Sequence, residues 1–192
     1  VKTGLKIIVP GLPIVEKGEL KSCLKTFMIS FPGHDFIFVG VENKFIDTLR
    51  KTKLRIDSVL IGQQPEWYSP NDFEEAAFKN IRRQVRRALN KRIEIEHLNL
   101  AQSRAFNHEL SISINGLVRK WRHTRGLDTF GFMVQPEVNL QRGYGHIFLA
   151  RRDGVLTGLL SCIPTPGDKG WYFEDLIRTA NAPNGTIESL LV

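Results

Sequence analysis

Three strand-like segments follow one another between residues 146 and 178 of this 192-residue chain. HIFLARR is followed by Asp153-Gly154 and then by VLTGLLSCI, and an Asp-Gly pair between two such segments is a strong signal for a two-residue hairpin turn. The loop PTPGDKG then leads to the third segment, WYFEDLIR. The sequence therefore predicts three consecutive antiparallel strands, followed by a final helix.

The first part of the chain alternates strand and helix patterns. LKIIVPGLPIV, DFIFVGV and LRIDSVLIG predict strands over residues 5–15, 35–41 and 54–62. GELKSCLKTFMISF and NKFIDTLRKT predict the helices between them, over residues 18–31 and 43–52. The order strand, helix, strand, helix, strand is typical of an α/β layer.

The clearest helix pattern spans residues 69–92, where Ser69 can cap the N-terminus and Pro70 suits the first turn. Its apolar side chains recur every four residues, and its opposite side is basic, with Arg82, Arg83, Arg86 and Arg87. Arginines four apart repel each other by a few tenths of a kcal/mol, which suggests an anionic partner such as tRNA phosphates or lipid headgroups. A solvated charged face, paired in part with nearby glutamates, is an equally good interpretation.

A strand over residues 93–100 and a second helix over residues 100–126 complete the predicted elements. The apolar side chains of this helix recur at helical spacing, with Ile114, Leu117 and Val118 among them. Gly126 suits the end of the helix.

Two carboxylates and an arginine lie on the last strand pattern. Because side chains alternate along a strand, one face is expected to hold Tyr172, Glu174, Leu176 and Arg178, and the other Phe173, Asp175 and Ile177. A carboxylate among apolar residues is costly to bury unless it is paired, so Glu174 or Asp175 is a candidate general base or an anchor for a substrate ammonium group. The pattern alone favours a structural pair with a buried arginine.

The turn Pro183 to Thr186, with the sequence PNGT, separates this strand from the final helix. Gly185 permits a positive φ or a close approach of another backbone, and Asn184 or Thr186 can cap the helix. Exposed N–H groups at a helix start also attract phosphate or carboxylate. By itself the motif favours a capped helix over a ligand site.

The composition of the chain and the spacing of its cysteines and histidines limit which partners and sites the protein can have. The net charge of +7 favours polyanionic partners, and no apolar run is long enough to cross a membrane. Two distant cysteines fit a cytosolic, reduced setting, and the absence of CxxC and HxxxH spacings predicts no metal site. QRGYG, residues 141–145, superficially resembles an acetyl-CoA pyrophosphate loop. It precedes a hairpin instead of opening a helix, and we discount it.

Two stretches together resemble a known family. Residues 59–91, VLIGQQPEWYSPNDFEEAAFKNIRRQVRRALNK, and residues 150–192, which end in DLIRTANAPNGTIESLLV, resemble the C-terminal catalytic domain of phosphatidylglycerol lysyltransferases, also called lysylphosphatidylglycerol synthases. The second stretch is the specific one. Gln63 and Gln64 stand where that family has an acidic residue, and the family's long membrane-spanning region has no counterpart here.

The resemblance implies an α/β (α+β) architecture of two tandem GNAT-like acyltransferase folds, with mixed sheets flanked by helices. The first half is expected over residues 1–98 and the second over residues 99–192, with sequence missing at both ends. It further implies transfer of an aminoacyl group from aminoacyl-tRNA to the glycerol hydroxyl of phosphatidylglycerol, or to another hydroxyl or amine, without a cofactor. The expected partners are aminoacyl-tRNA and anionic phospholipid headgroups, and the expected location is cytoplasmic, peripheral at the inner membrane face.

Carried over by position, the resemblance assigns three groups of site residues. Its catalytic group is Glu174, Asp175 and Arg178. Its substrate-binding group is Asn184, Gly185 and Thr186. Its polyanion-binding group is Arg82, Arg83, Arg86 and Arg87.

Two other functions stay open at this point. An acetyl-CoA-dependent N-acetyltransferase is the first, although a pyrophosphate loop is missing from the expected place. A non-catalytic GNAT-like module that binds RNA or membrane is the second, and it would depend on the arginines but not on the carboxylates.

Overall fold

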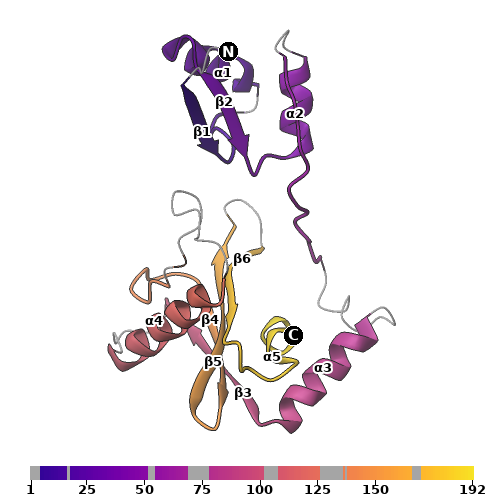
Figure 1. The fold of residues 1–192 in the computed structure, drawn as a ribbon, viewed down its shortest axis with the longest axis vertical. Coiled ribbons are helices and arrows are strands. Elements are labelled where there is room, and N and C mark those ends of the chain that lie inside the picture. The colour runs from indigo at the N-terminus through magenta and orange to yellow at the C-terminus, as the bar shows by residue number, and fades with distance from the viewer. Residues whose placement is uncertain are drawn as a thin grey trace. The chain divides into compact units, whose positions relative to one another are not determined.

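The computed structural model describes residues 5–16, 18–51, 55–68, 78–101, 108–125, 136, 138–165 and 170–192 (Figure 1). In chain order its elements are β1 (Lys6–Pro10), α1 (Leu20–Ser30), β2 (Asp35–Val39), α2 (Asn43–Arg50), α3 (Lys79–Asn90), β3 (Ile93–Asn99), α4 (His108–His123), β4 (His146–Arg152), β5 (Val155–Pro164), β6 (Trp171–Arg178) and α5 (Thr186–Leu191). The chain divides into two compact units, Val1–Pro65 and Glu66–Val192.

The first unit follows the order β1, α1, β2, α2. Strands β1 and β2 are parallel, with Ile8 opposite Ile37, and α1 forms the crossover that parallel neighbours require. Leu24 of α1 packs with Phe45 and Leu49 of α2 in a small buried core. The two strands and two helices predicted between residues 5 and 50 are therefore confirmed.

The third strand predicted for this region is wrong. Residues 55–62 have no strand structure, and Val59, Leu60 and Ile61 are largely exposed. Adjacent apolar residues point to both faces of a strand, so they form a stable strand only when both faces are covered. The described part of the first unit provides no such cover for these three residues.

The second unit is built on an antiparallel sheet with the strand order β3-β4-β5-β6. Asp153 and Gly154 connect β4 to β5 with φ values of 49° and 77°, which is the left-handed backbone that a tight hairpin turn needs. The hairpin and the three consecutive antiparallel strands are confirmed, and β3 adds a fourth strand at one edge.

Helices cover both faces of this sheet (Figure 1). On one face, Ile114, Leu117 and Val118 of α4 pack on a buried cluster that includes Leu159 and Ile177. On the other face, α3 and α5 contribute to a second cluster, whose buried members are Ala88, Ile93, Ala150, Leu160, Cys162 and Leu190. We call these the α4 side and the α5 side. Apolar side chains at helical spacing direct α4 onto its face, whereas α3 buries Ala88 and leaves its neighbour Leu89 exposed.

The compact units differ from the predicted halves. The predicted boundary between residues 98 and 99 falls inside β3, which pairs with β4 from Ile93 to Asn99 and so belongs with the strands that follow it. The start predicted for the long basic helix, including Ser69 and Pro70, lies outside the described residues. Whether either unit is GNAT-like stays a prediction.

The PNGT turn packs closely against α3. Gly185 has a φ of 96°, and a Cβ atom added to it would lie 2.0 Å from the carbonyl oxygen of Gln84 in α3. The same Cβ would lie 3.1 Å from the side chain of Ala88. Only glycine permits this approach, so packing between the two helices explains the residue at this position.

Replacing Gly185 tests this packing. We expect Gly185→Ala to lower the free energy of unfolding by about 3 kcal/mol, because it combines a left-handed backbone with a clash against a main-chain carbonyl. Gly154→Ala is the matched control, since Gly154 also has a positive φ but no atom would lie within 4 Å of its added Cβ. The control is expected to lose only about 1 kcal/mol. Equal losses in urea denaturation would show that the close approach to α3 is unimportant.

Candidate active site

A β-bulge in β6 determines how its carboxylates are arranged. Asp175 lies opposite Ser161 and Phe173 lies opposite Cys162, so Glu174 is an extra residue with no partner across the strand. Such a bulge breaks the regular alternation of side chains. Phe173 therefore packs with the buried cluster on the α5 side, whereas Ile177 belongs to the cluster on the α4 side.

The bulge brings both carboxylates into one neighbourhood. The Ser161 hydroxyl donates to Glu174 Oε2 at 3.1 Å, and Ser161 is also the cross-strand partner of Asp175. The prediction that Glu174 and Asp175 point to opposite faces is therefore wrong. A regular strand would have separated them, and the inserted residue removes that separation.

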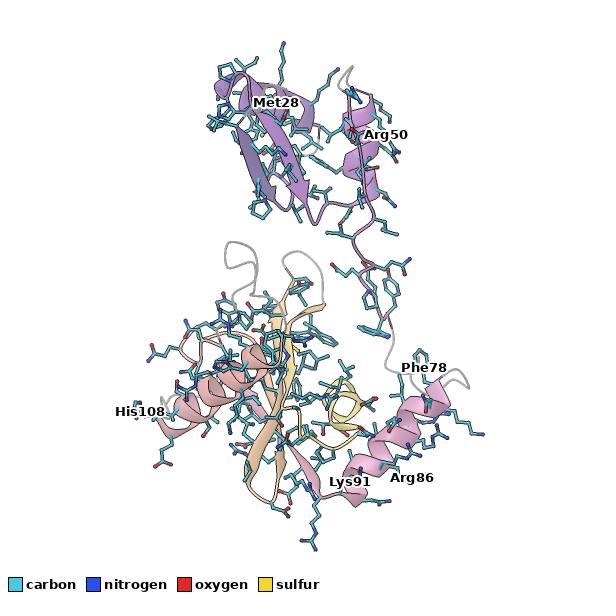
Figure 2. The ribbon with its side chains drawn as sticks, in the orientation of Figure 1. Met28, Arg50, Phe78, Arg86, Lys91 and His108 are labelled. Atoms are coloured by element: carbon cyan, nitrogen blue, oxygen red, sulfur yellow. The ribbon has the colours of Figure 1, made fainter. Side chains whose placement is uncertain are left out.

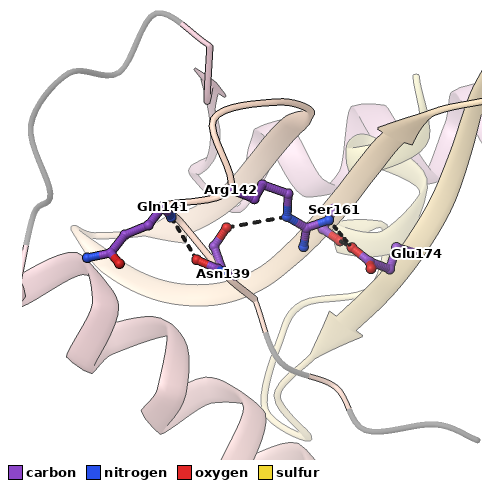
Figure 3. Close-up of polar contacts among 5 residues, drawn as sticks. All are labelled: Asn139, Gln141, Arg142, Ser161 and Glu174. Carbon is purple, nitrogen blue, oxygen red and sulfur yellow. Dashed lines mark hydrogen bonds and ion pairs between the residues drawn. The ribbon is translucent and has the colours of Figure 1, made fainter.

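Arg142 completes this cluster from the loop before β4 (Figure 3). Its Nη1 lies 2.8 Å from Glu174 Oε2, and its Nε donates to the carbonyl oxygen of Asn139 at 3.3 Å. The Asn139 side chain in turn accepts a hydrogen bond from the backbone N–H of Gln141 at 2.8 Å, which fixes the loop locally. The Arg142 side chain is only 11% exposed, against 34% for Glu174, so the guanidinium is largely withdrawn from water.

Sequence reasoning missed Arg142 and Ser161. Arg142 lies in the QRGYG segment that we compared with a pyrophosphate loop, but its guanidinium binds a carboxylate instead. A Cβ on Gly145 would lie 2.6 Å from the carbonyl oxygen of Cys162, so this glycine serves close strand packing. For Ser161 the available sequence signal was a serine within the otherwise apolar strand segment GLLSCI, and the structure shows this serine buried.

Burial raises the pKa of Asp175, the negative charge of Glu174 raises it further, and the positive charge of Arg142 partly lowers it. Asp175, Glu174 and Arg142 together carry two negative charges and one positive charge when all are ionised. The cluster is therefore suited to accepting a proton or binding a cation.

The other predicted site residues lie on the α5 side. Arg178 faces that side, opposite Gly158, and its Nη1 donates to the carbonyl oxygen of Ala182 at 3.3 Å. A cavity of about 250 Å³ is lined by Gln84, Arg178, Pro183, Asn184, Gly185, Thr186, Ile187 and Glu188. The structure thus brings Arg178 together with Asn184, Gly185 and Thr186, and separates it from Glu174 and Asp175.

Two polar groups of this cavity have clear local explanations. The Thr186 hydroxyl is fully buried and donates to the carbonyl oxygen of Pro183 at 2.7 Å, so it stabilises the turn. The Gln84 side-chain oxygen is buried and has no hydrogen-bond partner within the described part of the chain. The cavity therefore offers an acceptor from Gln84, a carboxylate from Glu188 and a guanidinium from Arg178.

The four arginines of the predicted polyanion surface lie on the exposed side of α3. Figure 2 shows Arg86 on this helix, with Lys91 just beyond its end. Arg83 donates to the side chain of Asn80 at 2.8 Å, one turn earlier. These side chains form a basic surface next to the cavity, because Gln84 of the same helix lines it.

Two further observations concern metals and membranes. No group of three or more His, Cys, Asp or Glu side chains that could hold a metal ion occurs among the residues that the structure describes. None of the helices in those segments is long and apolar enough to span a membrane.

Comparison with known proteins places the chain in a family. The sequence model of the family described as "Phosphatidylglycerol lysyltransferase, C-terminal" matches residues 2–192. The chain belongs to this family. The resemblance stated from the two sequence stretches is thereby confirmed. A search of curated proteins finds no match.

Two solved structures share the fold of this phosphatidylglycerol lysyltransferase family member. The C-terminal domain of a lysylphosphatidylglycerol synthetase from Agrobacterium fabrum has a TM-score of 0.69 and 14% identity, with 98% of this chain and 58% of that structure covered. L-PGS from Bacillus licheniformis also has a TM-score of 0.69, with 13% identity over 97% of this chain and 56% of that one. The chain therefore spans little more than half the length of each of these two proteins. The predicted class, an α/β fold with two sheets flanked by helices, is confirmed.

The raised pKa of Asp175 predicts a pH-dependent effect on stability. Ionised Asp175 is less favourable in the folded state than in the unfolded state, so its charge destabilises the fold at pH 7. Below the ordinary value of 3.8 the group is protonated in both states and the penalty disappears. We expect Asp175→Asn to be more stable than the parent at pH 7, with a difference that shrinks toward pH 3. A variant that is less stable at both pH values, measured by urea denaturation, would contradict this account.

Proposed function

We propose that this chain is an acyltransferase domain that transfers an aminoacyl group from aminoacyl-tRNA to a hydroxyl or amine acceptor, foremost a phosphatidylglycerol-like lipid. The observation that carries the proposal is the meeting of Glu174 and Asp175 at the β-bulge, beside Arg142. Membership of the phosphatidylglycerol lysyltransferase family supports the reaction class.

The reaction needs a group that accepts and returns one proton. The acceptor oxygen attacks the carbonyl carbon of the aminoacyl ester and loses its proton to a base. The ester C–O bond then breaks, and the ribose oxygen of the tRNA leaves with a proton. Asp175 suits this role, because its raised pKa makes its carboxylate a better base than that of an exposed aspartate.

Glu174 suits a positioning and electrostatic role. Arg142 and Ser161 both bind Glu174 Oε2, which fixes the carboxylate. With two carboxylates and one guanidinium, the cluster has a net charge of −1 when all three are ionised. That negative charge favours binding of the positively charged α-ammonium group of an aminoacyl ester at short range.

The α5 side supports separate substrate contacts. Arg178, Asn184, Gly185 and Thr186 surround the cavity there, and Arg178 offers donors for a phosphate or carboxylate group. Arg82, Arg83, Arg86 and Arg87 are proposed as contacts for tRNA phosphates or anionic headgroups. The protein would then act in the cytoplasm at the inner membrane surface, and its own residues need no metal or acetyl-CoA for the proton transfer described.

A transfer assay tests the reaction. The protein is incubated with a pool of radiolabelled aminoacyl-tRNAs and vesicles that contain phosphatidylglycerol. We expect label in the lipid fraction, and a loss of at least about a hundredfold in Asp175→Asn, because general base catalysis contributes on that order. Tyr172→Phe is the control, as it lies on the same strand outside the cluster. Measurable binding of coenzyme A without transfer from any tRNA would overturn the proposal.

The basic surface of α3 is tested by charge reversal. We expect Arg83→Glu combined with Arg86→Glu to weaken tRNA binding and to reduce the slope of log Kd against log salt by about 2, since each phosphate contact contributes roughly one unit. Lys21→Glu with Lys25→Glu is the matched control, because these exposed lysines are also near neighbours on one helix face, in the first unit. Equal effects of both pairs in a salt titration would show only a general charge effect.

A further inference from the structure

Aromatic and imidazole rings gather on the α5 side of the sheet, where β4 and β6 begin and β3 ends. We call this group the ring cluster, and its members are Trp67, His97, His146, Phe148, Trp171 and Phe173. The rings of His97 and Phe148 are stacked, with centroids 4.7 Å apart and planes at 13°. The Trp171 ring meets His146 edge-on, with centroids 4.4 Å apart.

Sheet register explains why these rings meet. His97 lies opposite Phe148, while Cys162 lies between His146 on one side and Phe173 on the other. Directly paired residues share a face, so the cross-strand pairs place rings from three strands side by side. Trp67 extends the group from outside the sheet by stacking on Phe173, with centroids 5.8 Å apart and planes at 28°.

The two histidines are joined to each other. His97 Nε2 lies 2.7 Å from His146 Nδ1, so one ring nitrogen donates a hydrogen bond to the other, and the two ring planes are inclined by 18°. Burial and the neighbouring His97 lower the pKa of His146. Both effects favour the neutral form of the His146 ring.

Part of the ring cluster is open to solvent. Trp171 is 50% exposed and Trp67 is 40% exposed. Single exposed apolar side chains are ordinary, whereas a connected group of exposed rings marks a binding surface. Histidine and phenylalanine rings within the group suit stacking of nucleobases, whereas tryptophan and tyrosine are the rings enriched at a membrane interface.

The same side of the sheet carries the basic surface of α3. Ala88 of α3 packs in the buried cluster on which Phe148 and Phe173 also pack. Figure 1 shows α3 and α5 on the same side of the sheet. Arg87 directly precedes Ala88 in α3. Positive charge for phosphates thus accompanies rings for bases, which is the combination used to bind single-stranded nucleic acid.

We propose that the ring cluster is a stacking platform for the bases of a single-stranded RNA end, with the arginines of α3 binding its phosphates. This inference rests on the proposed function, because it specifies which part of an RNA donor the domain holds. Trp171 is the more exposed of the two tryptophans and is the outer stacking surface. The His146 ring contacts Trp171, and His146 is held in turn by its hydrogen bond with His97, whose ring stacks on Phe148.

Binding of a defined RNA tests the platform. The probe is a fluorescein-labelled single-stranded RNA hexamer that ends in CCA, and its partner probe has the same backbone with abasic sugars at the last three positions. Fluorescence anisotropy gives both Kd values at 50 mM salt. We expect Trp171→Ala to weaken binding of the intact hexamer about tenfold, and to change binding of the abasic hexamer less than twofold.

Two variants control for folding and for general effects. Trp171→Phe keeps a ring and is expected to retain most of the affinity. Tyr172→Ala removes a side chain that is 46% exposed on the same strand but lies opposite Ile163, on the α4 side, so it is expected to leave binding unchanged. Thermal unfolding of each variant shows whether the fold is retained.

The outcomes separate this inference from the proposed reaction. Base-dependent binding that needs Trp171 supports the platform even if no aminoacyl transfer is detected, in which case only the reaction is rejected. An equal loss on both hexamers, or no loss, overturns the platform even if transfer persists. Loss of binding to phosphatidylglycerol vesicles in Trp171→Ala, with RNA binding intact, also overturns it and identifies a lipid contact instead.

Discussion

Strand β6 carries one residue without a cross-strand partner, Glu174, between Asp175 opposite Ser161 and Phe173 opposite Cys162. This single insertion sends Phe173 to the α5 side and keeps Asp175 with Ile177 on the α4 side. Without it, the side chains beyond the bulge would exchange faces, because the alternation along a strand has a period of two. Both the carboxylate cluster and the ring cluster depend on it.

The two faces of the sheet consequently offer different chemistry. On the α4 side, an ion pair between Arg142 and Glu174 lies next to a carboxyl group with a raised pKa. On the α5 side there are rings, a polar cavity and a basic helix. The clusters share one end of the sheet, since Arg142 precedes His146 by four residues and Glu174 follows Trp171 by three.

Local patterns predicted much of the fold and part of the site. The Asp153-Gly154 hairpin and the helical stripe of Ile114, Leu117 and Val118 depend on interactions within a few residues, and both are found. The exposed segment around Leu60 was predicted as a strand because its composition is that of a strand. A strand also needs a second strand to pair with and residues that pack on it, and the local sequence pattern does not indicate whether these exist.

The sequence by itself determined most of the elements, the basic face of α3 and, chiefly through the stretch over residues 150–192, the family. Tertiary structure alone decided which charged and aromatic side chains meet. The bulge at Glu174 arises from how β5 and β6 pair, and Arg142 reaches Glu174 across 32 positions of the chain. The His97 and His146 rings meet across 49 positions. Contacts between residues so far apart in the chain depend on strand register. That register is set by packing on both faces of the sheet, so a short stretch of sequence does not predict it.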